Sequence, residues 1–389
     1  MLYPWLEWQR VSLTAWLETA RAASAASPLA QLLHPPGELL ARTMAAGAIS
    51  ERPLEIVVRL DAPFPVRSEV IAVSPFVRLV HLRRTGPQRR RFVLLAPHSG
   101  YATAVISQLV VTLLALGEVV VTDWLDARLA PTAAGQFGLG EQIMVGLEAA
   151  GALGRPAHLV SLSQSGPATL ATAALLAART PELSPSSLVF MGCQLDPQVA
   201  PTPLQQVLGQ WPRDALASSL TSAVGSGYPG AGRRVYPALF QLLAYGMASP
   251  QLYAGVQHGF LGELVAGRAG NYGRQHADLH SLVDVPAELF LAMLDWMLDA
   301  SPWAEAGPRV GGSSYDLTPL RDVPVLTVEA GRDELIGPGQ THGLTRRLRW
   351  TKAMSVSVPK GSHHDLFTGS GFTAGVAPVL QHFYGELDR

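Results

Sequence analysis

Ser163, Asp333 and His363 each come shortly after an apolar segment with the pattern of a β-strand. A serine hydroxyl attacks an acyl carbon only when a nearby imidazole accepts its proton. A carboxylate beside that imidazole holds it in the required tautomer and stabilises it once it is protonated. The three residue types and their positions therefore predict acyl-transfer chemistry, with Ser163 as nucleophile, His363 as general base and Asp333 as the residue that orients the base.

The nucleophile would stand in the pentad 161–165, SLSQS, between a strand and a helix. Nucleophile turns of this kind commonly have glycine on both sides of the serine, and here both positions are serine. We expect the backbone N–H of Gln164, at the start of the helix, to stabilise an oxyanion, with a second donor from the loop at Ser99. Ser165, which precedes a glycine, is an alternative nucleophile.

Other reactive side chains have simpler interpretations. Asp196, after another strand, is a second candidate for the acid, whereas Asp123 and Asp126 are expected to hold their own loop together. A metal site at 363–365 is not expected, because adjacent side chains diverge and no other ligand cluster is evident. The single cysteine, Cys193, excludes an internal disulfide and a cysteine-based zinc site, and it fits a reducing compartment. We expect no cofactor.

The candidate residues need a scaffold that brings distant strand ends together. From about residue 91 apolar strand-like segments alternate with helix-like ones, which predicts a parallel sheet covered on both faces. The order Ser, Asp, His along the chain is that of an α/β-hydrolase fold. The predicted strands are 55–60, 77–82, 92–96, 119–122, 158–162, 187–191, 323–328 and 354–358, and the clearest helices are 101–116, 139–150, 167–179, 236–247 and 287–298.

The alternation defines a domain organisation. Residues 54–196 and 317–389 form the predicted α/β-hydrolase core, and residues 197–316 form a mostly helical cap or lid insertion without a convincing strand. Insertions between sheet strands often cover the carboxyl edge of the sheet, where α/β folds place their sites. Residues 1–53 form an N-terminal helical segment, which we expect to break near the sequence HPPG at 34–37.

The N-terminal segment has the spacing of an amphipathic helix, with apolar positions that include Val11 and Trp16. It does not resemble a signal peptide, because it has no basic leading region and charged residues interrupt its apolar run. Packing of this helix on the domain is one interpretation, and adhesion to a surface is the other. The apolar positions are Leu6, Val11, Leu13, Trp16 and Leu17.

Composition narrows the class of protein. Of 389 residues, 48% are hydrophobic and 15% charged, which predicts a globular chain. The formal net charge of -1 provides no basic excess for nucleic acid. Arginines at 83–84 and 89–91 are expected on a solvated loop rather than in an anion site. No uncharged run approaches the roughly 20 residues that a membrane span needs, so we expect a soluble protein.

Several stretches give the chain a family resemblance. From about residue 54 onward it resembles the intracellular polyhydroxyalkanoate (polyhydroxybutyrate) depolymerases, most distinctively in TDWLDAR at 122–128 and GPGQT at 337–341. The other stretches that carry the likeness are 74–81, 96–103, 191–196, 329–333 and 361–367.

The resemblance implies a cytoplasmic α/β-hydrolase, associated with storage granules, that cleaves ester bonds of a stored polyester or its oligomers through an acyl-enzyme. By position the family's nucleophile, acid and base correspond to Ser163, Asp333 and His363. Much of the family has cysteine at the nucleophile, so this chain departs from it there. Two alternatives stay open: a granule-binding protein without catalysis, and a small-ester esterase or acyltransferase with the same triad.

Overall fold

An eight-stranded sheet forms the centre of the molecule. The computed structural model describes residues 2–24, 28–44, 53–98, 103–268, 270–348 and 350–389. The strand order is β1-β2-β4-β3-β5-β6-β12-β13, with β2 antiparallel to both neighbours and the other adjacent pairs parallel. This arrangement is the α/β-hydrolase fold. The strands are β1 (Val66–Val73), β2 (Val77–Arg84), β3 (Arg90–Leu95), β4 (Gly117–Trp124), β5 (His158–Leu162), β6 (Ser187–Met191), β12 (Val325–Ala330) and β13 (Ala353–Val358).

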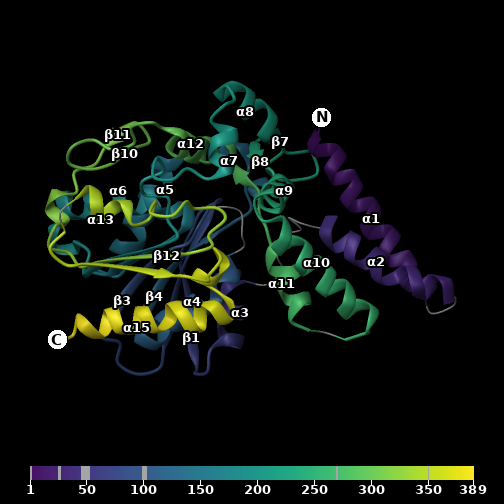
Figure 1. Cartoon of the computed structure of the whole chain (residues 1–389), viewed down its shortest axis with the longest axis horizontal. Helices are drawn as coiled ribbons and strands as arrows, with labels where there is room; N and C mark the ends of the chain where they lie inside the picture. The colour runs from purple at the N-terminus through teal and green to yellow at the C-terminus, as the bar shows by residue number, and fades with distance from the viewer. Residues whose placement is uncertain (1, 25–27, 45–52, 99–102, 269, 349) are drawn as a thin grey trace.

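Helices cover both faces of this sheet (Figure 1). One face carries α3 (Leu54–Asp61), α4 (Ser107–Leu116) and α15 (Ala377–Glu386), and the other carries α5 (Leu139–Gly151), α6 (Gly166–Arg179) and α13 (Gly343–Arg347). The central strands are therefore buried on both sides: β6 and β12 have no exposed or half-buried residue. Burial of both faces explains why these strands are continuous apolar runs rather than alternating patterns.

Most of the predicted core elements are confirmed, but one predicted strand is wrong. The segment 55–60 belongs to helix α3, whose buried Leu54 and Val58 are four residues apart, as one helical face requires. The strand β1 was not predicted. It lies at the sheet edge with half-buried and exposed residues, so the sequence carries little apolar alternation there.

The predicted break at 34–37 is also wrong. Helix α2 (Pro28–Met44) continues through Pro35 and Pro36. A proline removes a backbone donor and tends to kink a helix rather than necessarily end it. Here α2 lies between α1 (Leu2–Ser24) and α10 (Pro250–Val265), and this packing supports the segment from both sides.

Between β6 and β12 the chain leaves the large sheet and forms mostly helices. The expectation of no strand in 197–316 is wrong, because a three-stranded sheet and a two-stranded hairpin are present. Their strands have only two or three residues, too few for a periodic pattern to be visible in the sequence. The elements are α7 (Pro203–Leu208), α8 (Arg213–Leu220), β7 (Ser222–Ala223), β8 (Arg234–Tyr236), α9 (Ala238–Ala248), α10, α11 (Asn271–His280), β9 (Val285–Pro286), α12 (Ala287–Leu298), β10 (Arg309–Val310) and β11 (Ser313–Ser314).

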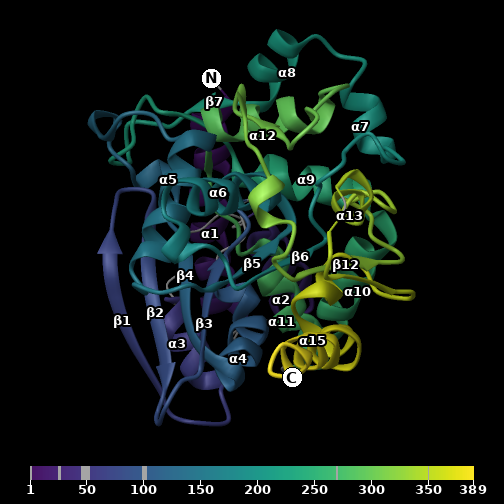
Figure 2. The same cartoon turned by 90° about the vertical axis from the view of Figure 1, so that its left-hand side faces the viewer.

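The N-terminal helices α1 and α2 form a hairpin on the far side of α10 and α11 from the sheet (Figure 1). In the view turned by 90°, the strands of the sheet lie in front of this hairpin (Figure 2). Within the part of the chain that the structure describes, no helix combines the length and apolar character needed to cross a membrane.

Candidate active site

Ser163 stands on a strained turn at the carboxyl end of β5. The chain passes from β5 through a single turn, η4 (Ser163–Ser165), into helix α6. Ser163 has φ of 55°, a left-handed conformation that side chains other than glycine rarely adopt. Such strain costs on the order of 1–3 kcal/mol and persists only where the surroundings enforce it. The turn directs the Ser163 hydroxyl toward the side chain of His363, 3.1 Å away.

The serines that replace the expected glycines are buried and hydrogen-bonded. The Oγ atoms of Ser161 and Ser165 are 2.9 Å apart, and Thr169 donates to Ser161. Ser165 Oγ also accepts from the Leu162 N–H and lies 2.8 Å from the Leu95 carbonyl oxygen. The hydroxyl of Ser165 is thus part of the scaffold that holds the turn, and its full burial leaves it no opening to a substrate.

Glycine is required one residue beyond the pentad. A Cβ on Gly166 would stand 2.9 Å from the Cβ of Cys193 and 2.7 Å from a Leu195 methyl group. Helix α6 can therefore approach this loop closely only because residue 166 is glycine. Cys193 itself is completely buried, and burial raises the pKa of its thiol to about 12. The thiol therefore stays protonated at neutral pH and packs behind the turn.

The imidazole of His363 connects Ser163 to a carboxylate. Its Nε2 is 3.1 Å from Ser163 Oγ, and its Nδ1 is 2.8 Å from an Asp333 carboxylate oxygen. The second oxygen of Asp333 accepts backbone N–H groups from Leu335 and Ile336, both at 2.9 Å, which fixes the carboxylate. Each bond of the predicted Ser163–His363–Asp333 relay therefore has hydrogen-bond length.

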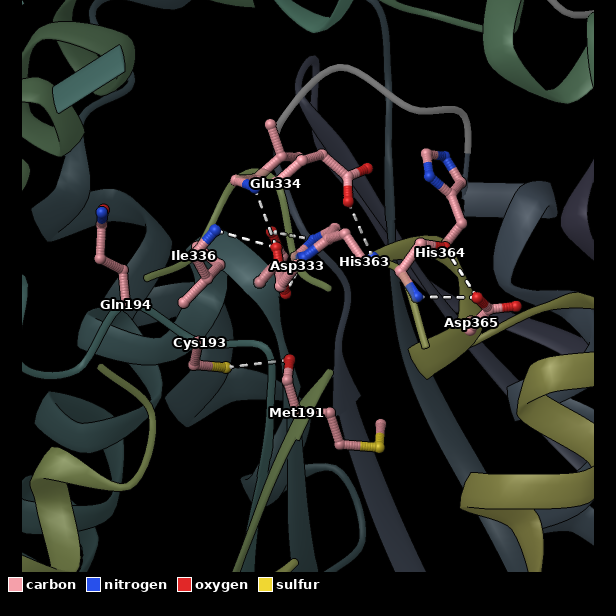
Figure 3. A network of polar contacts seen from close by, with 12 residues as sticks. Met191, Cys193, Gln194, Asp333, Glu334, Ile336, His363, His364 and Asp365 are labelled. Atoms are coloured by element: carbon pink, nitrogen blue, oxygen red, sulfur yellow. Dashed lines mark hydrogen bonds and ion pairs between the residues drawn. The ribbon is translucent and has the colours of Figure 1, made fainter. Parts of the chain in front are cut away.

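Glu334 adds a second carboxylate next to His363, and it was not among the predicted site residues. Glu334 accepts a 3.3 Å hydrogen bond from the His363 backbone N–H. Figure 3 shows Asp333 at the ring of His363 and Glu334 at its backbone, while His364 points away. Burial alone would lower the pKa of His363, but the charges of Asp333 and Glu334 together raise it above its usual value. A carboxylate next to the predicted acid is the signal that could have identified it.

Gly192 packs against the His363 ring and was also not among the predicted site residues. It has φ of 54°, and a Cβ there would stand 3.1 Å from the His363 ring and 2.5 Å from a Leu366 methyl group. The position directly follows β6, which neighbours β12, and Asp333 lies in the loop after β12. A glycine at a strand end is a weak signal by itself, because many glycines occupy turns without touching a reactive residue.

The other candidate carboxylates are held in ion pairs or hydrogen bonds away from His363. Asp196 accepts two hydrogen bonds from Arg347, at 2.8 and 3.2 Å, so it does not serve His363. Asp365 accepts hydrogen bonds from the backbone and hydroxyl of Ser362, both at 2.8 Å. Asp123 pairs with Arg78 and Asp126 with Arg128. Among the described residues no group of three or more His, Cys, Asp or Glu side chains could hold a metal ion.

Of the two predicted oxyanion donors, only Gln164 lies among the described residues. Gln164 follows Ser163 in η4, so its backbone N–H lies at the start of the helical segment. Ser99 lies outside the described residues. The neighbouring His98 is buried and stacks on Trp124 with ring centroids 4.2 Å apart. Neither ring nitrogen has a partner among the described residues, and burial lowers the pKa of His98 to about 3, so the ring is neutral.

Helices between β6 and β12 contact the loops that carry the candidate site residues. The Tyr245 hydroxyl on α9 is 3.3 Å from Nδ1 of His364, which directly follows His363. The indole N–H of Trp296 donates to the Gln194 carbonyl oxygen at 2.7 Å, just after the strand β6. The segment between β6 and β12 is therefore attached to two loops at the carboxyl edge of the sheet.

Comparison with known proteins gives a family and distant structural similarities. Residues 192–388 match the family model described as PHB de-polymerase C-terminus, a range that contains Asp333 and His363 but not Ser163. No curated protein sequence matches the chain.

Three of the similar solved structures illustrate the structural likeness. Rv0554 from Mycobacterium tuberculosis has 14% identity and a TM-score of 0.48 over 79% of this chain and 94% of its own. A 2-hydroxy-6-oxo-6-phenylhexa-2,4-dienoate hydrolase from Rhodococcus sp. strain RHA1 has 14% identity and a TM-score of 0.46, covering 82% of this chain and 99% of its own. A thermophilic esterase from Thermogutta terrifontis has 12% identity and a TM-score of 0.44, covering 83% and 99%.

Proposed function

The chain belongs to the family described as PHB de-polymerase C-terminus, and on that premise we propose that it is a serine-type carboxylester hydrolase acting on a polyhydroxyalkanoate (polyhydroxybutyrate) or its oligomers. The observation that carries the proposal is the continuous hydrogen-bonded path from Ser163 through His363 to Asp333. In this proposal residues 54–196 and 317–389 form the catalytic core and residues 197–316 a cap over it, with residues 1–53 as an N-terminal segment.

In the first half of the reaction an acyl-enzyme forms. Ser163 Oγ bonds to the ester carbonyl carbon while its proton passes to Nε2 of His363. The carbonyl oxygen becomes an oxyanion that the Gln164 N–H stabilises, with a further donor from the loop near Ser99. The intermediate then breaks the ester C–O bond, and His363 returns the proton to the departing alkoxide, which leaves as the hydroxyl end of the shortened chain.

In the second half water removes the acyl group. His363, neutral again, accepts a proton from water, whose oxygen bonds to the acyl carbon. The second tetrahedral intermediate expels Ser163 Oγ, which recovers its proton from His363, and the product is a hydroxy acid. Asp333 stabilises the imidazolium in both halves and keeps its carboxylate charge throughout. The charge of Glu334, which lies against the same histidine, acts in the same direction.

A thiol is not needed at the nucleophile for this chemistry. A serine hydroxyl hydrolyses esters readily when a base accepts its proton, and the imidazole of His363 lies within hydrogen-bond distance. Cys193 provides no alternative, since its buried thiol has a raised pKa and packs behind the turn. The serine-for-cysteine departure from the family is therefore compatible with an active esterase.

The test combines labelling of the nucleophile with assay of the polymer. We expect a fluorophosphonate probe to leave one phosphonyl adduct, located on Ser163 by mass spectrometry, and we expect release of hydroxy acid from an amorphous polyhydroxybutyrate suspension. The Ser163→Ala variant should lose both at unchanged melting temperature. Ser165→Ala is the matched control and should keep the adduct, since that hydroxyl only supports the turn.

Other outcomes would redirect the assignment. An adduct on Ser163 without polymer hydrolysis would move the substrate to a smaller ester, and formation of a new ester instead of free acid would indicate an acyltransferase. The proposal fails if the Ser163→Ala variant still turns over esters. If neither the adduct nor hydrolysis is observed, the protein is one that binds the polymer without catalysis.

A further inference from the structure

Helix α1 presents an apolar face to solvent. The exposed fractions of Trp5, Trp8 and Trp16 are 51%, 66% and 48%, and that of Val11 is 58%. Buried or half-buried tryptophan is the usual state in a folded domain, because the indole ring is the largest apolar side chain. Three of the chain's eight tryptophans are thus exposed along the first helix.

The remaining residues of this face are small and almost uncharged. Trp5 and Trp8 begin a row at helical spacing that continues through the small residues at 12, 15, 19 and 22, most of them exposed. The Thr19 hydroxyl donates to the Ala15 carbonyl oxygen at 2.9 Å, which satisfies its polar group within the helix. Glu18 is the one exposed charged residue on this side of α1 among the side chains that the structure describes.

Polar contacts of α1 are instead made on the side that faces the body. The Tyr3 hydroxyl is buried and donates to the Asp284 carboxylate at 2.6 Å. Glu7 accepts a 2.6 Å hydrogen bond from the hydroxyl of Tyr228. Among the described side chains of α1, the ones that bond to the body are therefore polar and the tryptophans are exposed, whereas an ordinary surface helix turns its apolar side inward.

Helix α2 continues the apolar surface. Leu32, Leu33 and Leu40 are 73%, 53% and 49% exposed, and the exposed Pro36 lies between them on the same side of the helix. A Cβ at Gly37 would stand 2.7 Å from the Trp16 ring, so that ring lies directly against α2. We name these exposed side chains the hairpin face; they are Trp5, Trp8, Val11, Trp16, Leu32, Leu33, Pro36 and Leu40.

The hairpin is held in place by contacts at its base. Besides the contacts of Tyr3, the Thr43 hydroxyl is within 3.3 Å of the His276 ring, and the Arg42 guanidinium lies over the Phe260 ring at 5.4 Å. Figure 1 shows the hairpin extending along the outside of α10 and α11, away from the sheet. These anchors fix the hairpin on α10 and α11 with its apolar residues exposed.

We infer that the hairpin face is a docking surface for the uncharged surface of an aliphatic polyester, an inference that rests on the proposed function. An anionic phospholipid surface attracts clusters of Lys and Arg. Among the described side chains of α1 and α2 the one Lys or Arg is Arg42, which pairs with Glu38 and lies over the Phe260 ring. A polyester surface presents methyl and methylene groups together with carbonyl acceptors and has almost no donors. Tryptophan matches that chemistry, because its ring is apolar and its indole N–H only donates.

Docking through this face would keep the enzyme at the polymer while the active site works on successive bonds. Binding at a second position raises the effective concentration of ester groups without any new contact at Ser163. The effect would appear on insoluble polymer and not on a soluble ester, which reaches the active site by diffusion.

The experiment separates docking from turnover. In the Ser163→Ala background, co-sedimentation with amorphous polyhydroxybutyrate particles is measured for a Trp5→Gln, Trp8→Gln double variant and for Trp211→Gln. Trp211 is 58% exposed on the insertion and is the matched control. We expect the double variant to bind at least tenfold more weakly and Trp211→Gln to bind normally. With Ser163 restored, both should hydrolyse a soluble p-nitrophenyl ester at the parent rate.

Several results would overturn the inference. Unchanged particle binding by the double variant, or an equal loss of particle binding in Trp211→Gln, would do so. So would tighter binding of the protein to vesicles of anionic phospholipid than to polyester. A dimer in sedimentation that the double variant abolishes would show that the face binds a second copy of the chain instead. Failure of the proposed function would look different: the parent protein would lack soluble-ester hydrolysis and the Ser163 adduct, whatever its particle binding.

Discussion

The candidate active site, Ser163 with His363 and Asp333, and the N-terminal hairpin of α1 and α2 place polar and apolar groups in opposite ways. At the candidate active site the side chains of His363 and Asp333 are 5% and 4% exposed, and both ring nitrogens of His363 are hydrogen-bonded. On the hairpin the polar hydroxyl of Tyr3 is buried, and the tryptophans are in water.

The two regions meet different physical requirements. Buried charges are stable only when they are paired, and their interactions are stronger there than in water, which suits proton transfer. Exposed apolar rings are costly in water unless a partner covers them, which suits docking. The polar groups of the candidate active site bond to one another within the chain, whereas we propose that the exposed apolar side chains of the hairpin contact an external surface.

The largest effect should follow loss of the Asp333 charge. Asp333→Asn leaves His363 in the wrong tautomer and removes the charge that stabilises its imidazolium, so kcat should fall about 10⁴-fold. Asp196→Asn is the matched control at a neighbouring strand end, where the carboxylate pairs with Arg347. Its turnover should stay within a few-fold of the parent. Equal loss in both variants, measured as kcat on a soluble ester, would contradict the assignment of the acid.

The next largest effect on kcat should come from Gly192, which packs against the His363 ring. Gly192→Ala would place a methyl group 3.1 Å from the His363 ring and force the imidazole to move. A misplacement of about 1 Å can cost on the order of 10²-fold in rate, so kcat should fall about 10- to 100-fold.

Gly154→Ala separates this contact from backbone strain. Gly154 has φ of 62°, close to that of Gly192, but a Cβ there would meet no atom within 4 Å. It should lose about 1 kcal/mol of stability from the left-handed conformation and keep its turnover. If thermal unfolding and kcat change in parallel in the two variants, steric contact with the histidine is not the cause.

A smaller effect should appear in the pH profile. Glu334 helps to raise the pKa of His363, and the histidine acts as base only when neutral. Glu334→Gln removes one negative charge, so the His363 pKa should fall and the acidic limb of kcat/KM should move to lower pH. The exposed Glu182 is the control, and Glu182→Gln should leave the profile in place. A limb that moves to higher pH in Glu334→Gln would refute this role.

The smallest effect on turnover is expected at the base of the hairpin. Tyr3→Phe removes the donor to Asp284 and leaves a buried carboxylate oxygen without its partner, which should cost about 1–3 kcal/mol. Soluble-ester hydrolysis should be unchanged, whereas backbone amides of α1 should exchange faster in hydrogen–deuterium exchange. Unchanged exchange in α1 would mean that this contact does not hold the hairpin.

Much of the core could be predicted from the sequence because its signals are local. The apolar runs that became β5, β6, β12 and β13 are long enough to show strand character, and the turn after β5 has its serine at the expected place. Predictions failed where local pattern and tertiary packing disagree. The segment of α3 has strand-like composition, and the prolines of α2 suggest a break that neighbouring helices remove.

Some functional detail carried no sequence signal. From the sequence, serine at 161 and 165 in place of glycine suggests a weakened nucleophile turn. The structure shows instead that the two hydroxyls are hydrogen-bonded to each other. The role of Gly192 depends on the position of a ring 171 residues later in the chain, the difference between 363 and 192. Likewise, exposure of the tryptophans in α1 follows from where the hairpin docks and not from their spacing.

The sequence by itself determined the strand–helix alternation, because that pattern depends on residues a few positions apart. It also determined the chain order of a serine, an aspartate and a histidine that each follow a strand, which needs no folding to be seen. Only the tertiary structure decided that Asp333 rather than Asp196 faces His363, and that Trp5, Trp8 and Trp16 of α1 are exposed. Those outcomes depend on strand order and on packing between segments hundreds of residues apart, which no local pattern encodes.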